Sequence, residues 1–540
     1  MEHKKADTLS RWLFGAVAVI CGLYIAGIFW TNLNARTWFN FDLYADAKLA
    51  QLISQTGSLF PAEWTFGNQL YVVATPAVAA LLYPLVSDPA LTLGAASCVM
   101  TVLLLLTFLW CIYPFTEKKP LLTGSLCFIG GVLICESASS DFEGMQILFT
   151  MGSYYACYLL GILFTVGLWL RLYTNRHARI LPVIICLLLN TALGMQSLRQ
   201  MLCLNLPLCA LGLLLVLVES NDRKTRLFSR WNLFSAACFA ANIAGILLIH
   251  LLKKAQPIRQ VDILPSADGT IWQNTSSSLR VLGDFIGLTS YAGTLFSKIA
   301  GVLFVAVVAF AVFRILRKRD TSPLACMILF CIISIAAVFA AGILIIHLRA
   351  IYFFVWHLTV TVSAVYLMEN SHTKMRNLLC FALLIVSTVN LVQQYRKDIA
   401  EFPKKTAFYQ EISDTLVADG VSHVYYNLWG MNNAARVAAV SNDRVIYCAI
   451  KPTPEPREES DLFTRIPYLH TEKWFAPDFN PRAYLCLAGG YLESEDNDPY
   501  REYLESHLTL MHRFTDGAED YCFYAFDETV YRDLIDFTAP

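Results

Sequence analysis

The most informative segment of the chain is Phe39-Asn-Phe-Asp-Leu-Tyr-Ala-Asp-Ala-Lys48, which follows an apolar stretch at 12–31. That stretch is long enough to cross a bilayer, lacks a small-residue cleavage site and has a tryptophan near each end. We therefore interpret it as a retained signal-anchor helix. Asp42 and Asp46 then lie where the chain leaves the membrane on its outer face. Ionisable side chains at a membrane boundary are costly and usually functional, so this placement indicates an enzyme.

Composition divides the chain into two parts. Of its 540 residues, 56% are hydrophobic and 15% are charged, whereas a soluble protein has about 25% charged residues. Long uncharged runs fill residues 1–395, and residues 396–540 have the charge density of a soluble domain. We expect a polytopic α-helical membrane domain followed by a C-terminal extracytoplasmic α/β domain. The net charge of −1 says nothing about nucleic acid, but the lack of a basic patch with interleaved aromatics argues against nucleic-acid binding.

Basic clusters set the topology, because basic loops stay in the cytoplasm. They lie at 118–119, 171–179, 223–230, 314–319 and 374–376. Placing the N-terminus and all the clusters inside gives about eleven spans, at 12–31, 90–115, 121–137, 153–170, 180–196, 200–218, 231–252, 293–313, 323–346, 350–368 and 377–394. The apolar run 69–87 contains Pro76 and Pro84, and a crossing there would place Lys118 outside. We therefore assign it to a re-entrant or interfacial element in a long first outer loop at 32–89.

The C-terminal domain reads as mixed α/β. A helix is expected at 408–418, and strands are expected at 424–427, 444–450, 484–488 and 521–526. Its cysteines, Cys448, Cys486 and Cys522, fall on these strands and are expected to be buried free thiols. The domain contains no nucleophile elbow or phosphate loop, so we expect it to recognise an acceptor, to form a lid over the outer cavity, or to give structural support.

Four short stretches resemble segments of one enzyme superfamily. They are Asp42-Leu-Tyr-Ala-Asp46-Ala-Lys-Leu-Ala50 with Gly57-Ser-Leu-Phe-Pro61, Pro61-Ala-Glu-Trp64-Thr-Phe-Gly67-Asn68, Arg349-Ala-Ile-Tyr352-Phe-Phe, and Trp429-Gly-Met-Asn-Asn-Ala-Ala-Arg-Val with the later Trp474. With the order of the parts, they resemble the GT-C membrane glycosyltransferases that use polyprenyl-phosphate sugars, in the aminoarabinose and mannosyl transferase branch. Two departures are Leu43, where the family has a glutamate, and two residues between the arginine and tyrosine of the third stretch.

The resemblance places Asp42 on the catalytic aspartate of the superfamily and leaves Asp46 as a candidate second acid. Such a transfer needs a carboxylate that takes the proton of the acceptor hydroxyl, and cations that stabilise the leaving phosphate. Arg349 and Arg199 lie in short outer turns and are the candidate cations. Tyr352 belongs to the Arg–Tyr segment, and His347 either joins the phosphate site or caps a helix end.

Other outer-face residues are candidates for substrate or metal contact. Tyr44 and Trp64 have rings that suit the apolar faces of a sugar, with Glu63 beside them. Asp141 and Glu143 lie in the second outer loop, where the resemblance implies acids that hold a divalent metal together with the first-loop aspartate. Oxygen ligands of this kind suit Mg²⁺ or Mn²⁺, although nothing in the sequence requires a metal.

Each candidate has a structural alternative. Asp42 and Asp46 suit a helix N-cap and a first turn, the arginines suit an interfacial position, and the aromatic rings suit the membrane belt. The preferred function is transfer of a sugar from a polyprenyl-phosphate donor to an acceptor outside the plasma membrane, such as a cell-wall polymer, a glycolipid or a protein. The alternatives are a transporter or lipid flippase, a non-catalytic scaffold, and a polymer ligase.

Overall fold

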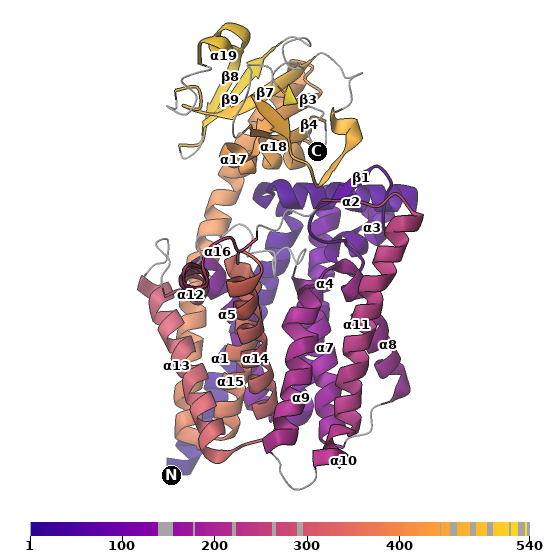
Figure 1. Ribbon diagram of the computed structural model, residues 1–540. Coiled ribbons are helices and arrows are strands. Elements are labelled where there is room, and N and C mark those ends of the chain that lie inside the picture. The colour runs from indigo at the N-terminus through magenta and orange to yellow at the C-terminus, as the bar shows by residue number, and fades with distance from the viewer. Residues whose placement is uncertain are drawn as a thin grey trace.

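Apolar helices form a bundle, and a smaller domain of strands and short helices lies at one end of it (Figure 1). The computed structural model describes residues 2–138, 155–175, 179–218, 223–261, 266–288, 295–442, 444–453, 462–475, 482–493, 501–517, 520–526 and 535–536. We call the end of the bundle near the N-terminus proximal and the end that carries the C-terminal domain distal.

Nine helices in the described ranges are long and apolar enough to cross a membrane. They coincide with nine of the predicted spans, and the two other predicted spans, 121–137 and 180–196, are helical as well. The chain is therefore a polytopic helical membrane protein, as predicted. The helices on these spans are α1 (Glu2–Leu33), α4 (Pro89–Ile112), α5 (Lys118–Ala138), α7 (Ala156–Tyr173), α8 (Ile180–Gln196), α9 (Leu206–Val218), α11 (Arg230–Ala255), α13 (Leu295–Lys318), α14 (Pro323–Leu344), α15 (Val355–Glu369) and α16 (Thr373–Ala418).

Basic clusters from separate loops meet at the proximal end. Arg376 forms an ion pair with Glu117 at 3.0 Å, and Arg314 donates a hydrogen bond to the backbone carbonyl oxygen of Asn370. The short helix α10 (Arg223–Leu227) lies at this same end of the bundle (Figure 1). These clusters therefore share one end, as the charge pattern predicted.

Two helices fill the first distal loop, residues 32–89. Helix α2 (Phe41–Thr56) ends at Gly57, whose φ of 67° is a left-handed conformation that glycine adopts without strain. Helix α3 (Thr75–Val86) has 12 residues, and at a rise of about 1.5 Å per residue it is too short for a hydrocarbon core about 30 Å thick. Its length agrees with the prediction that 69–87 does not cross.

The described residues of the C-terminal domain form a mixed sheet of seven strands. In spatial order its strands are β10 (Ile535–Asp536), β5 (Phe463–Arg465), β4 (Ile446–Pro452), β3 (His423–Asn427), β7 (Ala483–Ala488), β9 (Asp520–Ala525) and β8 (Thr509–Thr515). Strand β3 pairs in parallel with both β4 and β7, and β5 and β9 extend the sheet in the antiparallel sense. The four predicted strands are β3, β4, β7 and β9. The short α-helices in the described part of this domain are α17 (Leu428–Met431), α18 (Ala435–Ser441) and α19 (Arg501–His507).

A second, three-stranded sheet joins segments that are distant in sequence. Strand β1 (Trp64–Phe66) lies between β2 (Arg259–Gln260), which is parallel to it, and β6 (His470–Thr471), which is antiparallel. It thus connects the first distal loop, the loop before helix α12 (Ile271–Ile286), and the C-terminal domain. The C-terminal domain is therefore attached to the membrane domain by backbone pairing.

Helix α16 forms the main covalent connection between the two domains. It runs without interruption for 46 residues and includes Pro403. The predicted boundary at 395/396 falls inside this helix, so the last span and the start of the C-terminal domain are one element (Figure 1).

Candidate functional site

Asp42 lies in the first turn of α2 with a half-buried side chain. The helix is capped by Asn40, whose side-chain oxygen accepts a hydrogen bond from the backbone N–H of Leu43 at 3.0 Å. The N-cap role left open for Asp42 therefore belongs to Asn40. In the described part of the chain, no residue donates a hydrogen bond to the Asp42 carboxylate or forms an ion pair with it.

Arg349 immediately precedes a 3₁₀ turn, η5 (Ala350–Phe353), at the distal start of α15. Its side chain is exposed, as is that of His347 two residues earlier. The backbone carbonyl oxygen of Arg349 accepts a hydrogen bond from the N–H of Tyr352 at 3.0 Å, which closes the turn. Both predicted phosphate-site residues at this corner thus lie at the distal end and face solvent.

Asp42 and Arg349 interact electrostatically. Burial raises the pKa of Asp42 above its ordinary value, and the positive charge of Arg349 lowers it in part. The two groups form no ion pair within the described ranges. A carboxylate and a cation that are near each other but not bonded are both available to a ligand.

Arg199 lies between two aromatic rings. The central carbon of its guanidinium is 5.3 Å from the ring centroid of Tyr155 and 5.5 Å from that of Tyr352. The charges of both Arg199 and Arg349 act on the Tyr155 hydroxyl. The two predicted phosphate cations and Tyr352 therefore belong to one cluster, with Tyr155 as an additional member.

Gln69 connects this cluster to the first distal loop. Its Oε1 accepts hydrogen bonds from Nη1 of Arg199 at 2.6 Å and from the hydroxyl of Tyr158 at 3.1 Å. The side-chain oxygen of Gln196, at the end of α8, accepts from the backbone N–H groups at 72 and 73, at 3.2 Å and 3.1 Å. Loop and helix ends thus hold Arg199 in a fixed position.

The backbone after Arg199 is irregular. Residues Met201–Asn205 form a π-helical turn before α9. The Ser334 hydroxyl donates a hydrogen bond to the carbonyl oxygen of Cys203 at 2.7 Å. Single π turns inside helices are frequent at functional sites, so this geometry supports the assignment of Arg199 to the site.

Asp46 lies one turn after Asp42 and is fully buried. The spacing of four residues places both carboxylates on the same face of α2. Of these two aspartates, Asp42 is partly exposed to solvent and Asp46 is not. A second-acid role for Asp46 therefore stays a prediction.

The residues predicted to contact sugar lie at the interface between the domains. Tyr44 stacks on Trp474 with ring centroids 5.9 Å apart, and Trp64 meets the same ring edge-on at 6.0 Å. Glu63 forms an ion pair with Lys473 at 2.6 Å. Because both rings are buried against the C-terminal domain, sugar stacking on them stays a prediction that this arrangement does not support.

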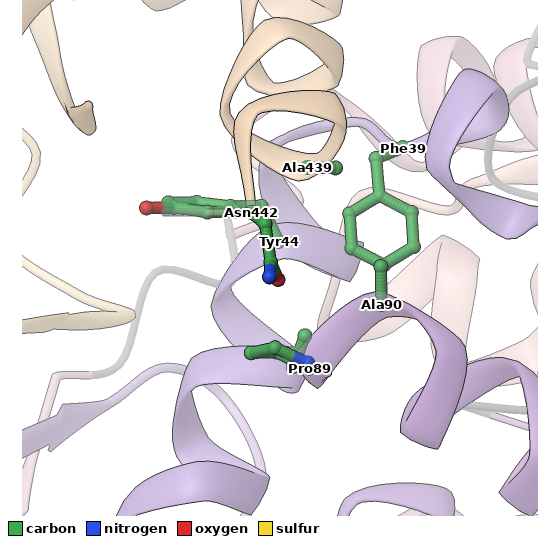
Figure 2. Close-up of a pocket in the computed structure, with 7 residues that line it drawn as sticks. Phe39, Tyr44, Pro89, Ala90, Ala439 and Asn442 are labelled. Carbon is green, nitrogen blue, oxygen red and sulfur yellow. The ribbon is translucent and has the colours of Figure 1, made fainter. Parts of the chain in front are cut away.

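A small pocket lies at the same junction, between α18 and the starts of α2 and α4 (Figure 2). It is lined by Phe39, Tyr44, Ala47, Pro89, Ala90, Ala439 and Asn442. Successive helical residues turn by about 100°, so Tyr44 points about 200° away from Asp42 around α2. The pocket therefore lies on a different side of the helix from the carboxylate, and we place the candidate site on the Asp42 side.

Asp141 and Glu143, the predicted metal ligands, lie outside the described residues. Within the described ranges, no cluster of three or more His, Cys, Asp or Glu side chains is arranged to hold a metal. Of the three predicted metal ligands, Asp42 alone lies within the described residues.

Sequence reasoning missed Tyr155, Tyr158, Gln69 and Tyr468. The two tyrosines have a detectable signal, because a spacing of three residues at the distal end of α7 places them on one helix face. Gln69 is a neutral side chain between apolar residues. Tyr468 belongs to the C-terminal domain, and its ring packs edge-on against Phe41 at 6.1 Å.

Comparisons with known proteins give the fold. No protein-family model matches the chain, and no curated protein sequence is significantly similar to it. Two crystal structures of ArnT from Cupriavidus metallidurans are similar to it. The one bound to undecaprenyl phosphate has a TM-score of 0.53 at 9% identity, over 95% of this chain and 98% of that chain. The apo structure has a TM-score of 0.50 at 11% identity, over 96% and 98%. At such low identity the likeness concerns the fold alone, and it agrees with the predicted order of a polytopic helical membrane domain followed by a C-terminal α/β domain.

Proposed function

We propose that this protein is a membrane glycosyltransferase that moves a sugar from a polyprenyl-phosphate donor to an acceptor at the distal end of the bundle. The observation that carries the proposal is the placement of Asp42 near Arg349 without an ion pair, with Arg199 in the same cluster. The shared fold with ArnT, one of whose structures holds undecaprenyl phosphate, supports this choice of donor.

The carboxylate and the arginines have different roles in the proposed reaction. The oxygen of an acceptor hydroxyl attacks the anomeric carbon, the bond from that carbon to the phosphate oxygen breaks, and the polyprenyl phosphate leaves. Asp42 takes the hydroxyl proton, and its raised pKa brings it closer to neutrality, where a general base is most effective. Arg349 and Arg199 stabilise the charge that develops on the departing phosphate.

The proposal also assigns the two sides of the membrane. We place the proximal end in the cytoplasm, because the basic loops gather there, and the C-terminal domain outside. A cell-envelope polymer, glycolipid or protein would then meet the distal site from the aqueous side, and the lipid phosphate would reach it from the bilayer. A divalent ion held by Asp42, Asp141 and Glu143 stays a proposal, and comparison of transfer with EDTA, Mg²⁺ and Mn²⁺ tests it.

The decisive experiment supplies membranes containing the protein with labelled undecaprenyl-phosphate sugars. Asp42→Asn should lower transfer at least about 100-fold, the usual contribution of a general base. Glu117→Gln is the matched control, because Glu117 is an exposed acid at the proximal end and its loss should leave transfer unchanged. If Asp42→Asn matches wild type, Asp42 is not the base. If wild-type protein transfers none of these sugars, the transporter and scaffold alternatives gain support.

A further inference from the structure

Tyr468 comes from the C-terminal domain but lies against the start of α2. Its ring packs edge-on against Phe41, the neighbour of Asp42, with centroids 6.1 Å apart. Its Cδ2 also lies 3.5 Å from the position that a Cβ on Gly67 would occupy. The C-terminal domain thus places a half-buried tyrosine beside the first turn of α2.

The backbone around Tyr468 is firmly held. The N–H of Leu469 donates a hydrogen bond to the carbonyl oxygen of Thr65 at 2.7 Å, and strand β6 begins at the next residue. Leu469 has a φ of 54°, a left-handed conformation that residues other than glycine rarely adopt. Strained conformations of this kind persist where the surrounding structure enforces them, and they are frequent at functional sites.

The hydroxyl of Tyr468 is a neutral donor. The pKa of Tyr468 is raised to about 12, because burial and, to a smaller extent, the charge of Asp42 raise it more than the charge of Arg349 lowers it. Across the described ranges no residue forms a hydrogen bond with this hydroxyl. Partly buried tyrosine hydroxyls usually have a hydrogen-bond partner, so this one is free to bind a ligand.

Tyr468 and the arginines belong to different parts of the site. Arg199 and Arg349 lie at the ends of membrane helices, where a lipid phosphate arrives. The domain that carries Tyr468 lies beyond those helix ends (Figure 1), on the side from which a water-borne acceptor enters. We propose that the Tyr468 hydroxyl donates a hydrogen bond to an oxygen of the acceptor and thereby positions the attacking hydroxyl beside Asp42.

This inference rests on the proposed function and deepens it, because it makes the C-terminal domain part of the acceptor site. A hydrogen bond to the acceptor has no effect on the slower reaction in which water attacks the same donor. The ratio of sugar transferred to membrane acceptors to free sugar released therefore separates acceptor positioning from structural damage.

The test uses full-length protein in membranes with labelled undecaprenyl-phosphate sugars. Tyr468→Phe should lower the ratio of transfer to hydrolysis about tenfold, as expected for one neutral hydrogen bond, and leave hydrolysis within about twofold. Tyr503→Phe makes the same chemical change on α19 of the same domain, and it should leave both reactions unchanged.

The outcomes are distinct. An unchanged ratio for Tyr468→Phe, or an equal fall in transfer and hydrolysis, overturns the acceptor role while the proposed function stands. A wild-type protein that neither transfers nor hydrolyses any of these donors overturns the proposed function and this inference with it.

Discussion

Arg436 of the C-terminal domain donates a hydrogen bond through Nε to the backbone carbonyl oxygen of Phe39 at 3.1 Å, three residues before Asp42. Through Nη1 the same guanidinium donates to the hydroxyl of Tyr409 on α16, also at 3.1 Å. Its side chain is only 9% exposed. One buried cation therefore connects α18, α16 and the segment that leads into α2.

Replacing Arg436 by glutamine should separate these elements. Hydrogen bonds to a charged group contribute about 1.5–3 kcal/mol each, and the shorter, neutral glutamine can replace at most one of the two, so the free energy of unfolding should fall by about 1.5–3 kcal/mol. Transfer should fall as well, because α2 loses a contact that fixes its start. Thermal unfolding in detergent and the membrane transfer assay measure the two effects.

Arg444→Gln is the control for this change. Arg444 pairs with Asp414 at 2.9 Å, but its side chain is 46% exposed, and exposed ion pairs contribute about 0–1 kcal/mol. Equal unfolding midpoints for the Arg436 and Arg444 variants would contradict the assignment of Arg436 as a link between the domains.

Two substitutions of Gln69 should separate its effect on the stability of the fold from its effect on phosphate binding. Gln69→Leu removes the oxygen that Arg199 and Tyr158 share, and a buried donor left without its partner costs about 1–3 kcal/mol. Both the unfolding midpoint and the affinity for undecaprenyl phosphate should fall. Gln69→Glu keeps an acceptor oxygen and adds a negative charge, so it should restore the midpoint while binding stays weak.

Native mass spectrometry with added undecaprenyl phosphate gives the affinity, and thermal unfolding gives the midpoint. If Gln69→Glu bound the lipid phosphate as tightly as wild type, Arg199 would not be a phosphate ligand, because a carboxylate beside it must oppose an anion.

The raised pKa of Asp42 predicts opposite effects on stability and activity. An acid whose pKa is higher in the folded than in the unfolded state binds a proton more tightly when folded. It therefore destabilises the fold fully above the folded pKa, and this cost disappears as the pH falls below the unfolded value near about 3.9. Asp42→Asn should raise the unfolding midpoint at neutral pH, leave it unchanged at pH ~4, and lower transfer at least about 100-fold.

The pH dependence of wild-type transfer provides a second measurement. Because Asp42 must lose its proton to act as a base, the rate should fall with decreasing pH at a value above the ordinary range of an aspartate. An Asp42→Asn protein less stable than wild type at neutral pH would show that the carboxylate is held by favourable contacts.

The set of membrane-spanning helices was predictable because two independent signals limit it. A span needs about 20 apolar residues, and each basic loop restricts the number of crossings before it. The run at 69–87 shows why both are needed. It is apolar enough to suggest a span, but the side assigned to Lys118 excluded a crossing, and its helix has only 12 residues.

The charged residues of the candidate site could also be predicted from the sequence, because Asp42, Arg199 and Arg349 lie among apolar residues. Gln69 was not, because a neutral amide gives no comparable signal and its partner Arg199 is 130 residues away. Tyr468 depends on the pairing of β1 with β6, a strand of two residues, which is too short to show periodicity. Sequence also could not show that Trp474 packs against Tyr44 and Trp64.

The uninterrupted helix α16 has a mechanical consequence. Its 46 residues extend about 69 Å, so one stiff rod reaches from the proximal membrane surface into the C-terminal domain. Pro403 lacks an N–H and so removes one backbone hydrogen bond from this rod, which makes it the weakest point for bending. A tilt of the last span, such as a thicker or thinner bilayer imposes, is therefore taken up by bending at Pro403, because the pairing of β1 with β6 and the hydrogen bond from Arg436 to Phe39 hold the C-terminal domain on the first distal loop. The position of Tyr468 beside the start of α2 thereby becomes independent of bilayer thickness.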